Sequence, residues 1–192
     1  MPLLLSATSP LWPSIALSDL DRTLGDHAHC EKKAAATAMK LVADHPGDPE
    51  RVRALARLAQ EEQQHFLAVL VELQRRGGVL PPDDGDPYAQ ELLALVRHGR
   101  ERLLDRLLVG ALIEARSCER MQILAERLPD AELARLYRGL LAAEARHHQA
   151  YVDLARAVGL FEEAEIRGRL TEIAAHEATV IGKASSEPRL HS

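Results

Sequence analysis

Two short motifs in the sequence combine a carboxylate with an imidazole at a spacing that suits metal binding. Both read Glu-x-x-His: Glu62 and His65 form the first pair, and Glu144 and His147 form the second. Side chains three residues apart leave the same face of an α-helix, so one metal ion can contact both members of a pair. The motif is too short to be specific, and its weight depends on its surroundings.

Two further glutamates lie within stripes of apolar residues that recur at helical spacing. Glu31 lies between Ala28 and Ala35 in one stripe, and Glu114 lies between Ala111 and Met121 in another. The two Glu-x-x-His motifs lie in similar stripes. A helix turns its apolar stripe toward the core, so four carboxylates are predicted to be buried there. Unpaired carboxylates in a core carry a prohibitive free-energy cost, which indicates that they share a partner.

The turn signals place these groups at one level. Pro46-Gly47 lies midway between Glu31 and Glu62, and Pro129 lies midway between Glu114 and Glu144. Residues equidistant from the turn of an antiparallel hairpin lie side by side, here about 15 residues or roughly 23 Å along the helices. We therefore predict one metal site, with the ligand set of di-iron or di-manganese carboxylate bundles, formed by Glu31, Glu62, His65, Glu114, Glu144 and His147.

The elements that must position these residues are long helices. The chain is rich in Ala, Leu, Glu and Arg and only 3% aromatic, which favours helix over strand. Pro and Gly breaks predict helices over residues 18–45, 49–76, 87–128, 130–158 and 162–182, with a possible break near Gly99. Two hairpins joined by a longer link predict an all-α four-helix bundle with additional short helices. The predicted divisions are an extended N-terminal arm over 1–17, a bundle domain over 18–182 and a flexible tail over 183–192.

Composition bounds the class of protein. With 192 residues and 46% hydrophobic residues the chain is long enough for one domain with a substantial core. The two cysteines cannot form a disulfide framework and fit a reducing compartment. We expect a cytoplasmic protein without a membrane span, because no apolar run reaches the required length of about 18 residues and no targeting signal is evident. A net charge of −5 neither requires nor excludes a nucleic-acid partner.

Three other residues stand close enough to the predicted ligands to support them. His27 lies one turn before Glu31, and Cys118 lies one turn after Glu114. His148 follows His147, but the three-residue spacing of the first motif favours His147 as the ligand. Each has an ordinary alternative: a hydrogen-bonded buried histidine, a small core residue and a surface histidine, respectively.

Two longer strings resemble helix signatures of the tRNA 2-methylthio-N6-isopentenyladenosine hydroxylase family, which belongs to the ferritin-like di-iron superfamily. They are DHAHCEKKAA at residues 26–35 and LLVGALIEARSCER at residues 107–120. The likeness extends from about residue 12 to residue 181. It implies a ferritin-like fold with all six predicted ligands present, two iron ions, O2 as co-substrate and an external electron donor. The implied activity is a monooxygenase reaction on the isopentenyl side chain of the modified adenosine beside the anticodon.

The same resemblance implies tRNA as the partner, and the expected oligomeric state is left open between a monomer and a small homo-oligomer. Candidate contacts to RNA phosphates, chosen because they adjoin the predicted ligands outside the apolar stripes, are Lys32, Lys33, Arg116 and Arg120. Two alternatives remain open at this point. One is another ferritin-like di-iron oxidase, peroxidase or ferroxidase; the other is a helical binding bundle without metal. The ligand types alone do not distinguish iron from manganese.

Overall fold

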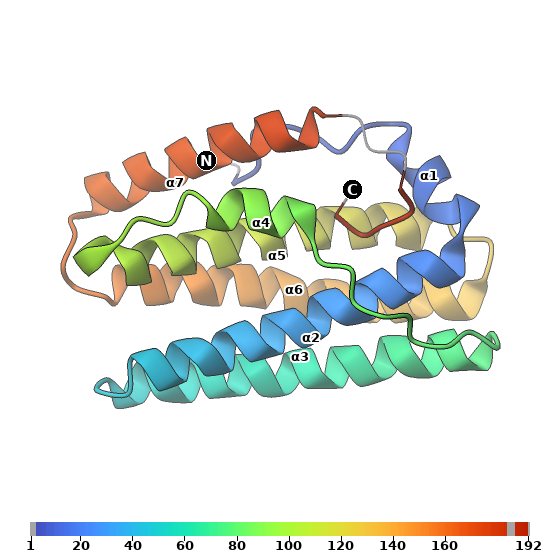
Figure 1. Ribbon diagram of the computed structural model, residues 1–192, viewed down its shortest axis with the longest axis horizontal. Coiled ribbons are helices and arrows are strands. Elements are labelled where there is room, and N and C mark those ends of the chain that lie inside the picture. Colours follow the sequence, from blue (N-terminus) through green and yellow to red (C-terminus); the bar gives the residue numbers. More distant parts are fainter. Residues whose placement is uncertain (1–2, 184–186, 192) are drawn as a thin grey trace.

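The computed structural model describes residues 3–183 and 187–191, and within that part of the chain all regular secondary structure is helical. The elements are α1 (Trp12–Ser18), α2 (Leu20–Asp44), α3 (Pro49–Arg75), α4 (Pro87–Leu93), a 3-10 turn η1 (Gly99–Glu101), α5 (Arg102–Arg127), α6 (Ala131–Arg156) and α7 (Glu163–Ile181). Helices α2, α3, α5 and α6 form the bundle, with α4 and α7 lying along one side (Figure 1). The prediction of an all-α four-helix bundle is confirmed.

Aspartate caps fix where three of the helices begin. The Asp48 carboxylate accepts hydrogen bonds from backbone N–H groups of the first turn of α3, and Asp86 and Asp130 do the same for α4 and α6. Such a cap satisfies N–H groups that have no partner within the helix. Proline in the first turn of α3 and of α4 fits because its position needs no N–H donor. These starts follow the sequence signals closely.

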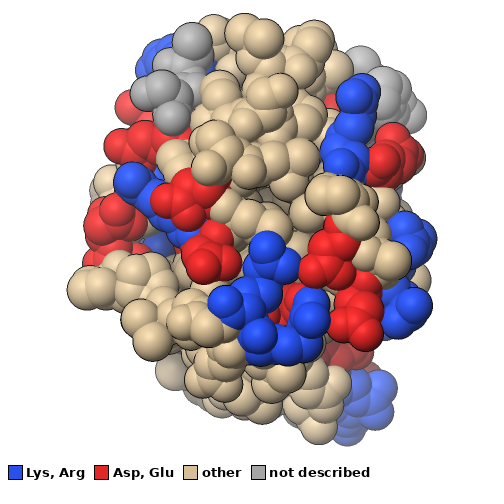
Figure 2. Space-filling model, turned by 90° about the vertical axis from the view of Figure 1, so that its right-hand side faces the viewer, with Lys and Arg blue, Asp and Glu red and all other residues tan. Residues whose placement is uncertain are grey.

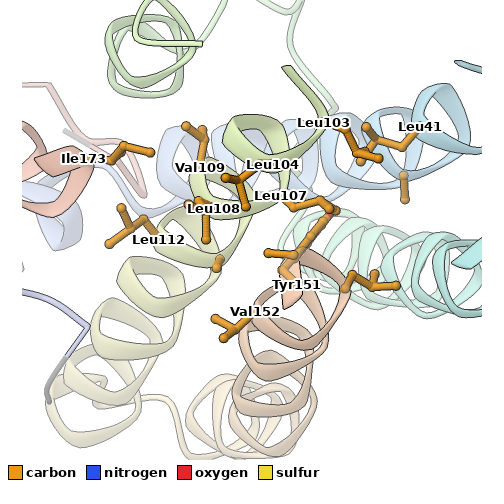
Figure 3. Packing of buried hydrophobic residues seen from close by; sticks show 14 of the residues in the cluster. Leu41, Leu103, Leu104, Leu107, Leu108, Val109, Leu112, Tyr151, Val152 and Ile173 are labelled. Atoms are coloured by element: carbon orange, nitrogen blue, oxygen red, sulfur yellow. The ribbon is translucent and has the colours of Figure 1, made fainter. Parts of the chain in front are cut away.

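Two apolar clusters fill the bundle, one on each side of a polar layer. The first cluster contains Leu41, Leu104, Leu108, Tyr151 and Ile173, which pack together in Figure 3. The second surrounds Trp12 at the opposite part of the bundle. Along each of the four long helices, the predicted ligands fall between residues of the first cluster and residues of the second. The carboxylates and imidazoles therefore form a layer enclosed by hydrophobic packing on both sides.

The helix predicted over residues 87–128 is divided in two. α4 ends at Leu93, and α5 begins only at Arg102 after the turn η1. Gly99 has a φ of +78°, a left-handed conformation that glycine adopts without steric cost, so the chain changes direction here. The division matters for the site, because α4 is a separate helix that lies along the side of the bundle instead of extending α5.

The prediction of an extended N-terminal arm needs correction, because residues 12–18 form helix α1. Pro13 stands in its first turn, where proline is tolerated, and does not prevent the helix. The Trp12 side chain is buried, and its indole N–H donates a hydrogen bond to the carbonyl of Arg189, 3.2 Å away. Residues 1–2 of the predicted arm lie outside the described residues.

The C-terminal segment folds back onto the bundle beside the start of α4 (Figure 1). Within the tail predicted as flexible, residues 184–186 and 192 lie outside the described residues, and residues 187–191 contact the body of the protein. Leu190 is fully buried and its backbone N–H donates to Asp26 at 2.8 Å. His191 contacts Ser117 of α5 and Asp86. No local pattern predicts this placement, because each contact joins residues far apart in the chain.

Candidate metal centre

The six predicted ligands come from four helices and are all buried. Glu31 projects from α2, Glu62 and His65 from α3, Glu114 from α5, and Glu144 and His147 from α6. Ligand atoms of the two Glu-x-x-His pairs lie within 4.8 Å of one another. The antiparallel hairpins α2–α3 and α5–α6 bring the residues to one level, as the spacing from the turns predicts.

The two imidazoles direct the same ring nitrogen toward the carboxylates. Nδ1 of His147 lies 2.7 Å from Oε1 of Glu62, and Nδ1 of His65 lies 3.1 Å from Oε1 of Glu144. Oε2 of Glu31 is 3.6 Å from the same His65 nitrogen. The two rings stack with centroids 5.4 Å apart. Five of the six residues thus converge through direct contacts around two imidazole nitrogens.

Glu114 is the sixth predicted ligand, and its electrostatic environment and its position associate it with the other five. Burial, together with the charges of Glu62 and Glu144, raises the pKa of Glu114 well above its usual range. Glu114 also lines a cavity that reaches the site from outside the bundle. It is the predicted ligand that faces this cavity.

Several of the inward-facing atoms lack hydrogen-bond partners. They are both carboxylate oxygens of Glu62, Oε1 of Glu144, and Nδ1 of His65 and of His147. These atoms approach each other closely, yet without the directions that hydrogen bonds require. Buried polar atoms are almost always satisfied, and leaving one unsatisfied costs about 1–3 kcal/mol. A cation held between the atoms satisfies all of them, so the residues fit a metal centre.

The protonation equilibria of the site reflect an excess of negative charge. Burial lowers the pKa of His65, but contacts with Glu144, Glu31 and Glu62 outweigh it and raise the value to about 12. Burial and the charge of Glu144 raise the pKa of Glu31, but the hydrogen bond from His27 and the nearby imidazole of His65 outweigh them and lower it to about 2. Four carboxylates around two imidazoles therefore draw positive charge into the site, which metal cations supply.

His27 lies where the sequence places it, against Glu31. Its Nε2–H donates to Oε1 of Glu31 at 2.6 Å, and its Nδ1 accepts from the Tyr137 hydroxyl at 3.3 Å. The rings of His27 and Tyr137 stack with centroids 5.4 Å apart. Because the Glu31 carboxylate can only accept, the proton stands on Nε2 of His27, and the Tyr137 hydroxyl can donate to Nδ1 and help to hold the ring against Glu31. Nothing in the sequence marks Tyr137 for this role, because its distance from His27 in the chain hides the contact.

Glu61 is a supporting residue that sequence reasoning missed. Its Oε2 accepts a hydrogen bond from Nε2–H of His147 at 3.1 Å and also pairs with Arg146 at 3.2 Å. With the proton held on Nε2, the lone pair of His147 stands on Nδ1 and faces the carboxylates. Helical spacing gives no hint of this role, because Glu61 points about 100° away from Glu62 around α3.

Cys118 and His148 stand at the margin of the site. Cys118 is half-buried, and burial together with the charge of Glu144 raises its pKa. Burial lowers the pKa of His148, whereas contacts with carboxylates raise that of His147 against the same effect. The described contacts join His147 to Glu62 and Glu144 but include none between His148 and these carboxylates. This asymmetry favours His147 as the ligand.

A cavity of about 270 Å³ leads to the site between α2 and α5. Among the described residues, the Cα atoms of these two helices stay more than 8 Å apart, whereas α3 packs directly on α6. α4 lies over the gap and contributes Ala89 and Leu93 to a lining that is mostly apolar. Gly110 and Tyr151 line it beside Glu114. The cavity thus offers an apolar space that ends at a predicted ligand.

The expectation that four basic residues can contact RNA phosphates needs correction for two of them. Arg116 is fully buried and pairs with Glu177 at 2.8 Å, and Arg120 is buried over the Trp12 ring. Both side chains point inward, where they link α5 to α7, to α1 and to the terminal segments. Lys32 and Lys33 keep part of their side chains exposed, although both pair with Asp83, at 2.9 Å and 2.8 Å.

The end of the bundle that carries the α5–α6 turn shows basic and acidic side chains interleaved (Figure 2). At this end Arg75 and Arg76 pair with Asp130, and Arg75 also pairs with Glu132. Because each of these positive charges is paired with a negative one, their electrostatic potentials largely cancel at the distance of an approaching phosphate. This end therefore offers no uniformly basic surface to a polyanion.

Comparisons with known proteins relate the chain to one family. A model of the family described as tRNA-(MS[2]IO[6]A)-hydroxylase (MiaE) matches residues 1–192. A Pseudomonas putida protein named tRNA 2-(methylsulfanyl)-N(6)-isopentenyladenosine(37) hydroxylase is 43% identical over 186 residues, covering 96% of this chain and 89% of its own length. A Salmonella typhimurium protein of the same name is 34% identical over 168 residues, covering 87% of this chain and 60% of its own length.

A solved structure extends the likeness to the fold. It is described as Protein 43 with aldehyde deformylating oxygenase activity, from Synechococcus. It superposes with a TM-score of 0.94 at 38% identity, covering all of this chain and 96% of the other. The bundle and its additional helices are therefore shared with a protein whose description names an oxygenase activity on a different substrate.

Proposed function

The chain belongs to the tRNA-(MS[2]IO[6]A)-hydroxylase (MiaE) family, and from this membership we infer that it hydroxylates 2-methylthio-N6-isopentenyladenosine in tRNA on the isopentenyl side chain. The observation that carries the conclusion is the family match over all 192 residues. A modified adenosine beside the anticodon lies in a single-stranded loop, so it can turn outward into a pocket without opening a duplex. The ferritin-like bundle and its buried ligand cluster fit this oxygenase activity.

We propose that two iron ions are held by Glu31, Glu62, His65, Glu114, Glu144 and His147. The support is the donor set itself, four carboxylates and two imidazoles, and the buried oxygen and nitrogen atoms that lack partners. Iron supplies the reduction of O2 and the oxidation of an unactivated C–H bond, for which no side chain is a strong enough oxidant. In such a reaction one oxygen atom would enter the C–H bond and the other would leave as water, with two electrons from an external donor and two protons from solvent.

The chain's own residues orient and shield this chemistry. Hydrogen bonds of His27 with Glu31 and of Glu61 with His147 hold two of the proposed ligands in place. The apolar clusters on both sides of the ligand layer keep bulk water away from it. Shielding of this kind protects a reactive centre from side reactions.

We propose that the cavity between α2 and α5 receives the isopentenyl group. Its volume of about 270 Å³ lies near the lower end of the roughly 300–1,000 Å³ of sites for whole small molecules. That size suits a five-carbon side chain with the adenine ring remaining at the rim. The lining is largely apolar, as a prenyl group requires. Arg106 stands among the lining residues where a polyanion could be met, whereas the ammonium of Lys33 is buried against Asp83.

The remaining partners follow from the proposed reaction. We propose that the enzyme takes electrons from an external donor and works in the cytoplasm, where mature tRNA is found, as a monomer or a small homo-oligomer. Among the described residues, no helix combines the length and apolar character that crossing a bilayer would take.

One observation favours a second substrate class. The Synechococcus structure, with 38% identity, is described as having aldehyde deformylating oxygenase activity. An apolar cavity that ends at an oxygenase centre can hold an aliphatic aldehyde as readily as a prenyl chain. The same purified protein should therefore be tested on both substrate classes.

The decisive experiment is mass spectrometry of nucleosides from tRNA that carries the prenylated, unhydroxylated adenosine. The iron-loaded protein with reductant and isotopically labelled O2 should add one labelled oxygen atom to that nucleoside. The Glu144→Ala variant should add none, because it lacks a carboxylate of the site. Unchanged tRNA together with turnover of a long-chain aldehyde would replace the tRNA assignment with the second substrate class.

A further inference from the structure

A second group of metal-ligating side chains lies on the wall of the cavity, outside the six-residue cluster. It comprises Cys30 from α2, Asp86 immediately before α4, and His191 from the C-terminal segment. We propose that these three residues, hereafter the Cys30 site, bind one divalent transition-metal ion of the zinc class. This site is separate from the proposed di-iron centre and uses none of its ligands.

The separations between the donor atoms match a tetrahedral site. Nδ1 of His191 lies 3.7 Å from Sγ of Cys30 and 3.1 Å from Oδ2 of Asp86, and the latter two atoms are 3.9 Å apart. Ordinary zinc bond lengths place sulfur about 3.6 Å from a neighbouring nitrogen or oxygen, and nitrogen about 3.3 Å from oxygen. Each observed separation is therefore within about 0.3 Å of what one shared ion requires.

The groups behind the donors hold them in place. The second ring nitrogen of His191, Nε2, lies 2.9 Å from Oγ of Ser117. With a metal ion on Nδ1, the ring proton stands on Nε2, and this N–H donates a hydrogen bond to the hydroxyl. Oδ1 of Asp86 accepts the N–H of Ala89 at 3.0 Å, which leaves Oδ2 for the ion. Partners of this kind orient metal ligands and fix the histidine tautomer.

The charge and chemistry of the donors select the kind of ion. Sulfur and imidazole prefer zinc-class ions over magnesium or calcium, which take oxygen ligands. Oδ2 of a further carboxylate, Asp26, lies 4.0 Å from Sγ of Cys30 and adds negative charge beside the site, although Arg189 pairs with that residue at 3.3 Å. Coordination replaces the thiol proton with the metal ion, and the proton leaves to solvent through the cavity.

The site would join three segments that are distant in the chain. α2, the start of α4 and the C-terminal segment meet here, beside the cavity that also contains Glu114. A bound ion would therefore hold the C-terminal segment against the cavity wall. Without an ion, the same contacts would be an internal hydrogen-bond network, and metal binding distinguishes the two.

Cobalt(II) provides a direct probe, because thiolate coordination gives an intense near-ultraviolet charge-transfer band. The full-length protein is first loaded anaerobically with two equivalents of iron(II) per chain and then titrated with cobalt(II). We expect the band to saturate at one equivalent of cobalt per chain and to disappear when zinc is added. None of the six proposed iron ligands contains sulfur, so cobalt exchanged into that centre cannot produce the band.

The variants assign the band to its ligands. Cys30→Ser should abolish it, and His191→Ala should weaken cobalt binding by more than the roughly 10–100-fold that loss of a supporting hydrogen bond costs. Cys118→Ser is the matched control and should leave the band unchanged. Circular dichroism and an iron content of two per chain show that each variant is folded.

A band that survives in Cys30→Ser would overturn the proposal, and so would wild-type protein that gives no thiolate band. In the second case the three residues serve only as a hydrogen-bond network. Activity on tRNA plays no part in this readout, so failure of the Cys30 site and failure of the proposed hydroxylase function are separate results.

Discussion

Glu61 accepts a hydrogen bond from Nε2–H of His147 at 3.1 Å and so determines which nitrogen of that ring faces the buried carboxylates. Glu61 itself is partly exposed at the surface of α3, while its neighbour Glu62 lies in the core. Two adjacent glutamates thus have different tasks, one as a proposed ligand and the other as the group that orients a ligand. This relationship leads to the first prediction.

Replacing Glu61 with alanine should weaken iron binding about 10–100-fold, the usual effect of removing a hydrogen-bond partner of a ligating histidine. Glu61→Gln should restore much of the affinity, because the amide oxygen can still accept the N–H of His147. Iron retention during dialysis against a graded chelator measures the effect. Glu50→Ala, on the same helix and paired with Arg53 at its exposed start, is the control. Equal retention in Glu61→Ala and Glu50→Ala would contradict the orienting role.

The two adjacent histidines of α6 should behave differently. His147→Ala removes one of two imidazoles from the proposed centre and should abolish or severely reduce both bound iron and hydroxylated product. The helix should persist, because alanine favours it. His148→Ala should keep most of the iron, since the described contacts of His148 include none with the site carboxylates. Iron per chain and nucleoside product are measured for both variants. Loss of metal in His148→Ala alone would show that the assignment of the ligand is wrong.

The sequence predicts the bundle and the level of the site because both depend on local signals. The starts of three helices are marked by the N-cap residues Asp48, Asp86 and Asp130. Helical spacing places the glutamates on inward faces. The turns then set the register of each hairpin. Every one of these features is contained within a few neighbouring residues or within one hairpin.

What the sequence does not predict depends on contacts between distant segments. Arg116 looks like a surface residue because it lies outside the apolar stripe of α5, yet α7 supplies Glu177 and buries it. His191 gives no signal at all, because its partners Ser117 and Asp86 are more than 70 positions away. Helical periodicity reports which face points to the nearest core, but it does not report which further elements cover the other faces.

Gly110 should control access to the inner end of the cavity. A Cβ added there would lie 3.0 Å from the Tyr151 ring, closer than ordinary contact, beside the predicted ligand Glu114. Gly110→Ala should therefore narrow the cavity and lower hydroxylation at least tenfold while iron content stays at the wild-type level. Overpacking should cost about 1–3 kcal/mol of unfolding free energy, partly offset by the higher helix propensity of alanine.

Gly139→Ala provides the matched control for this substitution. Gly139 also lies within a long helix, α6, but a Cβ there would meet nothing within 4 Å. That variant should be slightly more stable than wild type, by up to about 1 kcal/mol, with full activity. Wild-type turnover in Gly110→Ala would show that the substrate does not use this end of the cavity.

Asp105 should make the unfolding free energy depend on pH in the acidic range. It is fully buried, with Oδ1 2.8 Å from Arg97 and Oδ2 2.9 Å from Arg169, so it joins α5 to α7. Burial raises the pKa of Asp105, but hydrogen bonds from both arginines outweigh it and lower the value to about 2. The folded value is below the unfolded value of about 3.9, so the stabilisation is present above that pH and is lost as pH falls through about 2.

Asp105→Asn should accordingly reduce the unfolding free energy by about 3 kcal/mol at neutral pH, the scale of breaking a buried ion pair. The difference from wild type should shrink as the pH is lowered from about 4 toward 2. Urea unfolding followed by circular dichroism at several pH values measures this. Asp44→Asn, which removes an exposed pair with Lys40, is the control and should leave the unfolding free energy nearly unchanged. A difference that is independent of pH would contradict the ionic origin.

Binding to tRNA should depend steeply on salt if basic residues at the cavity meet phosphates. Each phosphate contact releases counterions, so affinity should fall by orders of magnitude between about 50 and 200 mM salt when several contacts form. Arg106 lines the cavity, and Lys32, next to the lining residue Lys33, is partly exposed, so Lys32→Ala and Arg106→Ala should each reduce the slope of log affinity against log salt by about one. Arg53→Ala, at the exposed start of α3, is the control and should leave the slope unchanged. The slopes come from fluorescence anisotropy with a labelled anticodon stem-loop. An affinity that does not change with salt would indicate that recognition rests on the prenyl group alone. An unchanged slope in both variants would place the phosphate contacts elsewhere on the protein.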